Sequence, residues 1–151
     1  MPETARRRLR RTPCIGVCST TYGDLVCRGC KRFAHEVVGW NGFADAQRHV
    51  VWTRLNRLLA ESVRAYVTVV DEKRLRSVAP ERVPDGDALP VEVVAFRTMR
   101  ARPLPMAALG LAARDRGDES AAATRETVRW IDREFYTRSR AYYEASFKTL
   151  T

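Results

Sequence analysis

The chain has 151 residues, 45% of them hydrophobic, and a formal net charge of +9. This length and composition predict one ordinary domain, or a small module and a second small domain, without a membrane span. The charge alone does not identify an anionic partner, because arginines outnumber lysines so strongly that a compositional bias would scatter them over every exposed face. Residues 1–12 nevertheless hold an arginine cluster and predict a flexible basic arm: Arg6, Arg7, Arg8, Arg10 and Arg11.

The next segment holds the only four cysteines of the chain, Cys14, Cys18, Cys27 and Cys30. Sulfur donors at such short spacing are typical of a tetrahedral Zn²⁺ site or of an iron–sulfur cluster. The alternative is a pair of disulfides in a secreted protein, but no apolar signal segment precedes the cysteines. We therefore expect four thiolate ligands in a reduced, cytoplasmic protein.

The residues between the cysteines leave the identity of the metal open. Gly29, in the turn from Cys27 to Cys30, should let both sulfur atoms converge on one point, which is typical of a zinc knuckle. The same four cysteines also suit an iron–sulfur cluster, although the Cys-Pro pair of bacterial ferredoxins is missing. Zinc would make the module structural, whereas a cluster would permit electron transfer, cluster delivery or iron and oxygen sensing.

Helical patterns follow the cysteines. Residues 31–38 predict a short helix, after which Trp40 is expected to close over the metal site. A longer helix is expected to be capped by Asp45, because apolar residues recur at helical spacing after it as far as Val63. Residues 13–62 are therefore predicted to form one four-cysteine module.

The remaining residues, 63–151, predict a small accessory domain. Residues 65–70 are rich in β-branched side chains and predict a strand, although a helix that continues from 45 to 70 fits the pattern as well. Residues 91–96 predict a second strand, which would pair with the first. A final helix is expected over about residues 119–148. The predicted fold class of the whole chain is α+β, with the cysteine module followed by a small sheet and a long C-terminal helix.

The order of several residues in the module resembles that of a bacterial protein family. These residues are the cysteines with their neighbours, an acidic residue, two tryptophans and two arginines: Pro13, Cys14, Gly16, Cys18, Cys27, Gly29, Cys30, Glu36, Trp40, Arg48, Trp52 and Arg54. Residues 12–58 thus resemble the family called domain of unknown function 1289, described as predicted iron–sulfur proteins of the YdhL type. The resemblance implies that the four cysteines are ligands, and it implies no activity, substrate or partner. Lys31 departs from the family pattern, in which a small residue or glycine is expected.

Arginines on the final helix suggest a second interpretation. Arg125, Arg129 and Arg133 are spaced four residues apart and share one helix face, which is typical of a solvated surface or of contacts with phosphates. A zinc knuckle that exposes Arg28, Lys31 and Arg32, together with the basic arm, would add to such contacts. The chain would then be a nucleic-acid-binding protein.

The sequence contains no pattern that predicts a reaction. It lacks a phosphate-binding glycine loop, a nucleophile elbow and a dinucleotide fingerprint, and His35 lacks the second histidine of a metalloprotease helix. The leading hypothesis is a metal- or cluster-binding accessory protein that contacts a protein partner through its C-terminal helix, and nucleic-acid binding is the alternative. A third hypothesis is a thiol sensor in which Cys27 and Cys30 form a reversible disulfide after metal loss.

Overall fold

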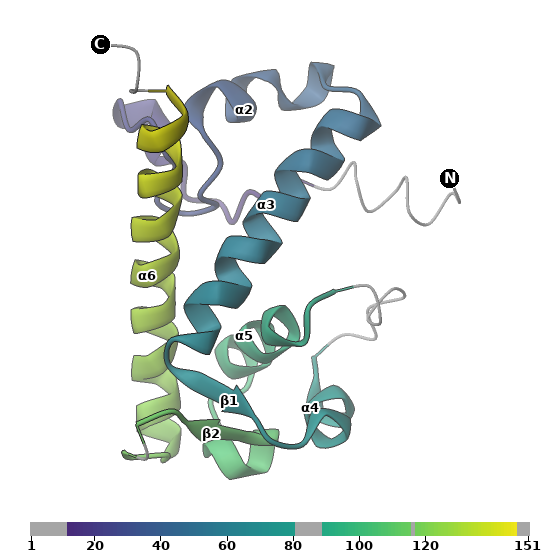
Figure 1. Cartoon of the computed structure of the whole chain (residues 1–151), viewed down its shortest axis with the longest axis vertical. Helices are drawn as coiled ribbons and strands as arrows, with labels where there is room; N and C mark the ends of the chain where they lie inside the picture. Colours follow the sequence, from purple (N-terminus) through teal and green to yellow (C-terminus); the bar gives the residue numbers. More distant parts are fainter. Residues whose placement is uncertain (1–11, 81–88, 116, 148–151) are drawn as a thin grey trace. The chain divides into compact units, whose positions relative to one another are not determined.

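The computed structural model describes residues 12–80, 89–115 and 117–147 (Figure 1). These residues form helices and one two-stranded antiparallel sheet, so the predicted α+β class is confirmed. None of the helices in the described ranges is both long and apolar enough to cross a membrane. The arginines of the predicted basic arm lie outside the described residues.

The chain divides into two compact units. The first, which we call the cysteine unit, comprises residues up to Leu55 and residues from Tyr136 onward. The second, which we call the sheet unit, is Asn56–Phe135. The boundaries between the units fall inside two helices, α3 (Asp45–Arg64) and α6 (Ala121–Phe147).

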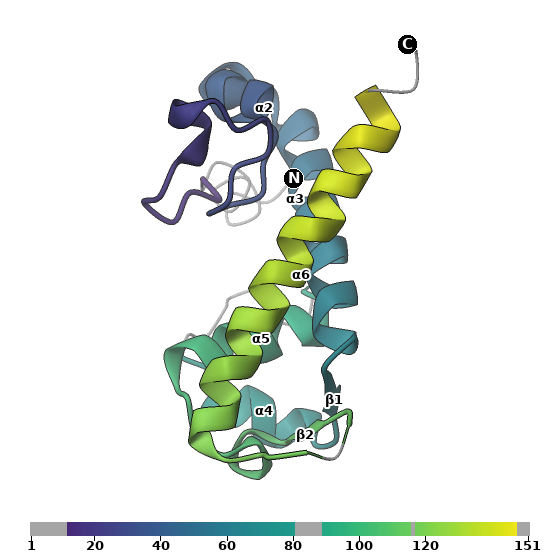
Figure 2. The ribbon, with the colours of Figure 1, turned by 90° about the vertical axis from the view of Figure 1, so that its left-hand side faces the viewer.

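The cysteine unit contains three short helical segments before α3, namely η1 (Ser19–Tyr22), α2 (Ala34–Gly39) and η2 (Trp40–Gly42). Figure 2 shows the loops around the cysteines doubling back on themselves beside α2. The predicted helix over residues 31–38 begins only at Ala34, because Phe33 pairs with Val26 in an antiparallel bridge. The predicted longer helix is present, but Asp45 is its first residue and not the cap before it.

The sheet unit is built on two short strands, β1 (Val67–Val69) and β2 (Leu111–Ala113). They run antiparallel, and α4 (Glu72–Val78), α5 (Val91–Ala101) and η3 (Met106–Leu109) lie beside them (Figure 1). Helix α5 contacts α4, η3 and β1. The core is formed by apolar side chains that these elements bury completely or nearly so: Leu75, Val93, Met99, Leu109 and Leu111.

Two expectations about this unit are wrong. Residues 91–96 are the first half of helix α5 and not a strand, and the partner of β1 is β2. A short apolar run that is buried on every side has no periodicity that separates strand from helix, and Val93, Val94, Ala95 and Phe96 are all buried. The rival helix from 45 to 70 is also wrong, because α3 ends at Arg64 and the β-branched residues after it pair with β2.

Candidate metal centre

The second pair of cysteines lies in a tight hairpin. The Cys27 N–H donates to the carbonyl oxygen of Arg32 at 2.9 Å, and the Lys31 N–H donates to the carbonyl oxygen of Cys27 at 2.8 Å. These bonds fold residues 28–31 into a turn, with Cys27 directly before the turn and Cys30 within it. Both side chains are buried, with exposed fractions of 1% for Cys27 and 7% for Cys30.

The first pair of cysteines lies in a more open loop. Cys14 is exposed, and its sulfur accepts a hydrogen bond from the Gly16 N–H at 3.4 Å. Cys18 is half-buried, and its sulfur lies 3.0 Å from the Thr20 hydroxyl oxygen. The Cys27 thiol donates to the carbonyl oxygen of Val17 at 3.5 Å, so the two cysteine loops touch.

Gly29 is required by this contact between the loops. A Cβ atom at residue 29 would overlap the carbonyl oxygen of Val17 and press on the side chain of Ile15. The backbone of Gly29 is not in the left-handed region, so the glycine is needed for close approach and not for an unusual backbone conformation. Gly29 was expected to let the two sulfurs converge. The structure gives a different reason for the glycine, because the other cysteine loop occupies the space in which a Cβ atom would lie.

We expect Gly29→Ala to lower the free energy of unfolding by about 1–3 kcal/mol, because overpacking against a backbone atom forces the loops apart. Urea unfolding of the two proteins measures the difference. Gly42→Ala is the matched control in the same unit, since a Cβ there meets no atom and its backbone is not left-handed. Equal losses in the two variants would contradict the role of the Gly29–Val17 contact.

The surroundings of Cys27 favour its deprotonated form. Burial raises the pKa of the Cys27 thiol, but backbone hydrogen bonds from Cys30, Ser19 and Gly29 outweigh burial and lower this pKa to about 7. Such a ring of backbone donors stabilises a sulfur anion in the way that a metal ligand requires. Cys27 is thus the cysteine of this centre that is best prepared to bind a cation.

The charge of Cys27 affects the thiols of Cys18 and Cys30. Burial raises the pKa of the Cys30 thiol, and the charge of Cys27 raises it further, against a hydrogen bond from Arg32. A hydrogen bond from Thr20 lowers the pKa of the Cys18 thiol, whereas the charge of Cys27 opposes this effect. Cys18 and Cys30 therefore each lie within electrostatic reach of Cys27.

The structure does not gather all four predicted ligands around one point. Within residues 12–80, 89–115 and 117–147, no group of three or more His, Cys, Asp or Glu side chains is arranged to hold a metal ion. Cys14 makes only a local hydrogen bond, at the exposed edge of its loop. The chemistry of the donors fits zinc or an iron–sulfur cluster, since all four are soft sulfur atoms. Their role as ligands stays a prediction.

A buried ion pair connects the hairpin to α3. The Arg54 guanidinium donates to both carboxylate oxygens of Glu36, at 2.6 and 2.7 Å, and it lies 3.9 Å from the centre of the Phe33 ring. The same carboxylate accepts the Phe33 N–H at 2.8 Å, which satisfies a free donor at the start of α2. Sequence reasoning had assigned no role to either residue. A glutamate three residues after the N-cap of a helix is the sequence pattern that could have indicated the hydrogen bond between Glu36 and the Phe33 N–H.

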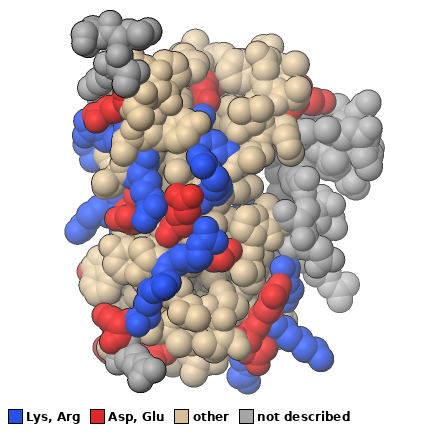
Figure 3. Space-filling view, viewed as in Figure 1, with Lys and Arg blue, Asp and Glu red and all other residues tan. Residues whose placement is uncertain are grey.

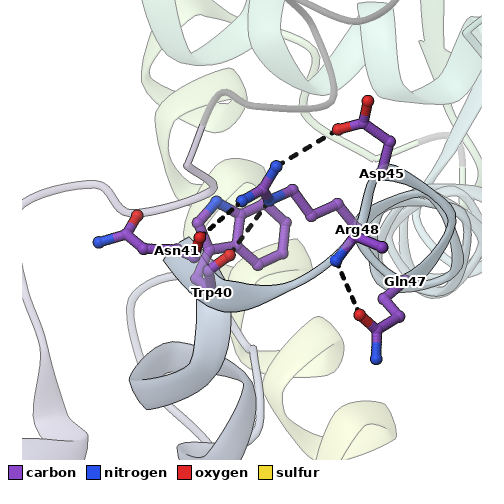
Figure 4. A network of polar contacts seen from close by, with 6 residues as sticks. Trp40, Asn41, Asp45, Gln47 and Arg48 are labelled. Atoms are coloured by element: carbon purple, nitrogen blue, oxygen red, sulfur yellow. Dashed lines mark hydrogen bonds and ion pairs between the residues drawn. The ribbon is translucent and has the colours of Figure 1, made fainter.

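Trp40 contacts an arginine that is hydrogen-bonded to a cysteine sulfur. Its ring is buried, and the guanidinium of Arg32, which bonds to the Cys30 sulfur, lies 5.0 Å from the ring centre. A second arginine, Arg48, holds the backbone of this segment, as Figure 4 shows. It donates to the carbonyl oxygens of Trp40 and Asn41, each at 3.1 Å, and to Asp45 at 3.3 Å. These bonds hold the backbone of η2 against the start of α3.

The aromatic residues at the end of α6 pack inside the cysteine unit. The Phe33 ring lies 6.2 Å from Tyr142, 5.1 Å from Tyr143 and 5.7 Å from Phe147, measured between ring centres. The exposed His35 lies beside the same cluster, 5.7 Å from Phe147. These aromatic side chains of α6 are therefore occupied by packing within the unit, and a protein partner for the C-terminal helix stays a prediction.

Of the three basic residues that the knuckle was predicted to expose, Arg28 is exposed and the other two are buried. Lys31 and Arg32 are 1% and 3% exposed, so neither is available to contact phosphates. The predicted arginine stripe on α6 is exposed, and Arg129 forms an ion pair with Glu126 at 3.0 Å. Acidic side chains lie among the basic ones over the described part of the face in Figure 3.

Residues 12–59, which contain the four cysteines, Glu36 and Arg54, match one family model. The family is Protein of unknown function (DUF1289). The predicted resemblance is thereby confirmed over the DUF1289 segment, which takes in the cysteine loops, α2, η2 and most of α3. No curated protein and no solved structure matches the chain. The burial of Cys27 and Cys30, the Gly29–Val17 contact and the Glu36–Arg54 pair all lie within the DUF1289 segment.

Proposed function

We propose that the DUF1289 segment is a metal-binding module that holds one Zn²⁺ or an iron–sulfur cluster on Cys14, Cys18, Cys27 and Cys30. The observation that carries this proposal is the hairpin that buries the sulfur atoms of Cys27 and Cys30 within one short turn. The lowered pKa of the Cys27 thiol is consistent with a sulfur that binds a cation. The contact between the two cysteine loops supports a shared centre for both pairs.

Binding would require the open loop to close. Cys14 would turn inward from its exposed position, and the Cys27 thiol would give up its hydrogen bond to Val17 when it loses its proton. When bound, zinc would stabilise the fold, whereas a cluster would supply electron transfer or delivery. Such a module would belong to an accessory or adaptor protein to which no reaction is assigned. Reduced metal-holding cysteines support a cytoplasmic location.

The test is metal analysis of the protein purified without air and without a metal-binding tag. An absorption spectrum is recorded on the same sample. About one zinc per chain in a colourless protein would support a closed four-thiolate site. Iron and sulfide in similar amounts, with broad absorbance near ~400 nm, would support a cluster. Protein that holds neither, and that takes up neither on reconstitution, would overturn the proposal.

A further inference from the structure

The cysteine unit buries two arginines, Arg32 and Arg54, which have different partners. Arg54 has the carboxylate of Glu36 as its partner. Arg32 is only 3% exposed, and no carboxylate of the described residues forms an ion pair with it. Its Nε donates instead to the sulfur of Cys30 at 3.3 Å, and its guanidinium lies over the ring of Trp40.

A buried guanidinium needs a nearby negative charge. Arginine stays protonated in proteins, so its charge is not removed by burial, and an unpaired buried charge is strongly unfavourable. The face of the Trp40 ring offsets part of this cost through a cation–π contact. The Cys30 sulfur is the remaining partner, and it is a full anion only when it has lost its proton.

We propose that Arg32 is the built-in counter-charge of the metal centre, donating an N–H···S hydrogen bond to the Cys30 thiolate and holding that sulfur in place. The inference rests on the proposed function and goes beyond it. Four thiolates around one Zn²⁺, or around a cluster, leave an excess of negative charge. A buried guanidinium beside one of the sulfurs neutralises part of that excess and strengthens the hydrogen bond. Arg32 is thus a positioning residue and not itself a ligand.

The neighbouring residue supports the same geometry. Lys31 adopts a left-handed backbone conformation, with φ 66°, which is unfavourable for a residue other than glycine. Its side chain is buried and its ammonium donates to the carbonyl oxygen of Gly29 at 3.0 Å. This conformation closes the turn after Cys30 and directs the chain so that Arg32 bonds to the sulfur. The turn therefore carries two buried cations next to one predicted ligand.

The test compares Arg32→Gln with Arg48→Gln. Both arginines lie near the Trp40 ring, at 5.0 and 5.9 Å from its centre, but Arg48 bonds to two carbonyl oxygens and Asp45 and not to sulfur. Zinc affinity is measured by competition with a chromophoric chelator. We expect Arg32→Gln to weaken zinc binding about 10–100-fold, as loss of a residue that supports a ligand does, and Arg48→Gln to change it less than about threefold. Arg32→Lys should recover part of the loss, because the charge returns without the planar donor.

A second readout separates a role at the sulfur from a general loss of packing. In the protein loaded with Co²⁺, the thiolate-to-cobalt absorption band should shift in Arg32→Gln and keep its position in Arg48→Gln. Equal affinity and an unshifted band in Arg32→Gln, with metal still bound by the unaltered protein, would overturn the role of Arg32 alone. Failure of the unaltered protein to bind Zn²⁺ or Co²⁺ would instead overturn the proposed function.

Discussion

Replacing Cys27 and Cys30 together with serine should abolish metal binding. Both sulfurs are buried in the hairpin, and a serine hydroxyl is a far poorer donor for zinc or an iron–sulfur cluster than a thiolate. The proposed centre would keep only Cys14 and Cys18, which lie in the more open loop. Metal content per chain, measured on both proteins purified side by side, checks the expectation.

The same variant should lose all metal-dependent stability. A ligand that binds only the folded state adds about 2.7 kcal/mol at 100 times its dissociation constant, so zinc should raise the unfolding midpoint of the unaltered protein. The serine variant should show no such rise at any zinc concentration. Unfolding of both proteins in the presence of a chelator is the control, because it isolates the packing effect of the substitutions. A variant that retains the metal content of the unaltered protein would refute the assignment of these two ligands.

Glu36→Ala should lower the free energy of unfolding by about 3–5 kcal/mol, which is the usual cost of removing one partner from a buried ion pair. The substitution leaves the Arg54 guanidinium without a carboxylate, and the side chain of Arg54 is only 9% exposed. It also removes the acceptor of the Phe33 N–H at the start of α2. Urea unfolding at neutral pH measures the loss.

Two further variants sharpen this experiment. Glu36→Gln keeps an oxygen for the Phe33 N–H but removes the charge, so we expect a loss between those of the unaltered protein and Glu36→Ala. Glu126→Ala removes an exposed ion pair with Arg129 and should change stability by less than about 1 kcal/mol. If Glu36→Ala and Glu126→Ala cost the same, the Glu36–Arg54 pair does not stabilise the hairpin.

The Glu36–Arg54 pair and Arg32 give the hairpin two distinct supports. The pair joins the hairpin and α2 to α3 through charges that cancel within the protein. Arg32 brings a positive charge whose partner is the sulfur of Cys30, a proposed ligand. Loss of the pair should therefore lower stability with and without metal, whereas loss of Arg32 should act mainly on the metal-bound state.

Some features of this protein follow from the amino-acid sequence alone. The four cysteines lie close together in the sequence, and this spacing predicts a set of sulfur ligands that stays a prediction. Helix α3 and the long α6 also follow, since the 3.6-residue period is a local property of the chain. The order of residues 12–59 is sufficient to match the family.

Other features depend on contacts between residues that are distant in sequence. Residues 91–96 form a helix because the sheet unit surrounds them, and the partner of β1 lies more than forty residues further along the chain. The carbonyl oxygen of Val17 explains Gly29, and the Cys30 sulfur and Trp40 ring explain why Arg32 is buried. From the sequence alone, a basic residue next to a cysteine is expected to be exposed. Its burial depends on the partners that the tertiary structure brings to it.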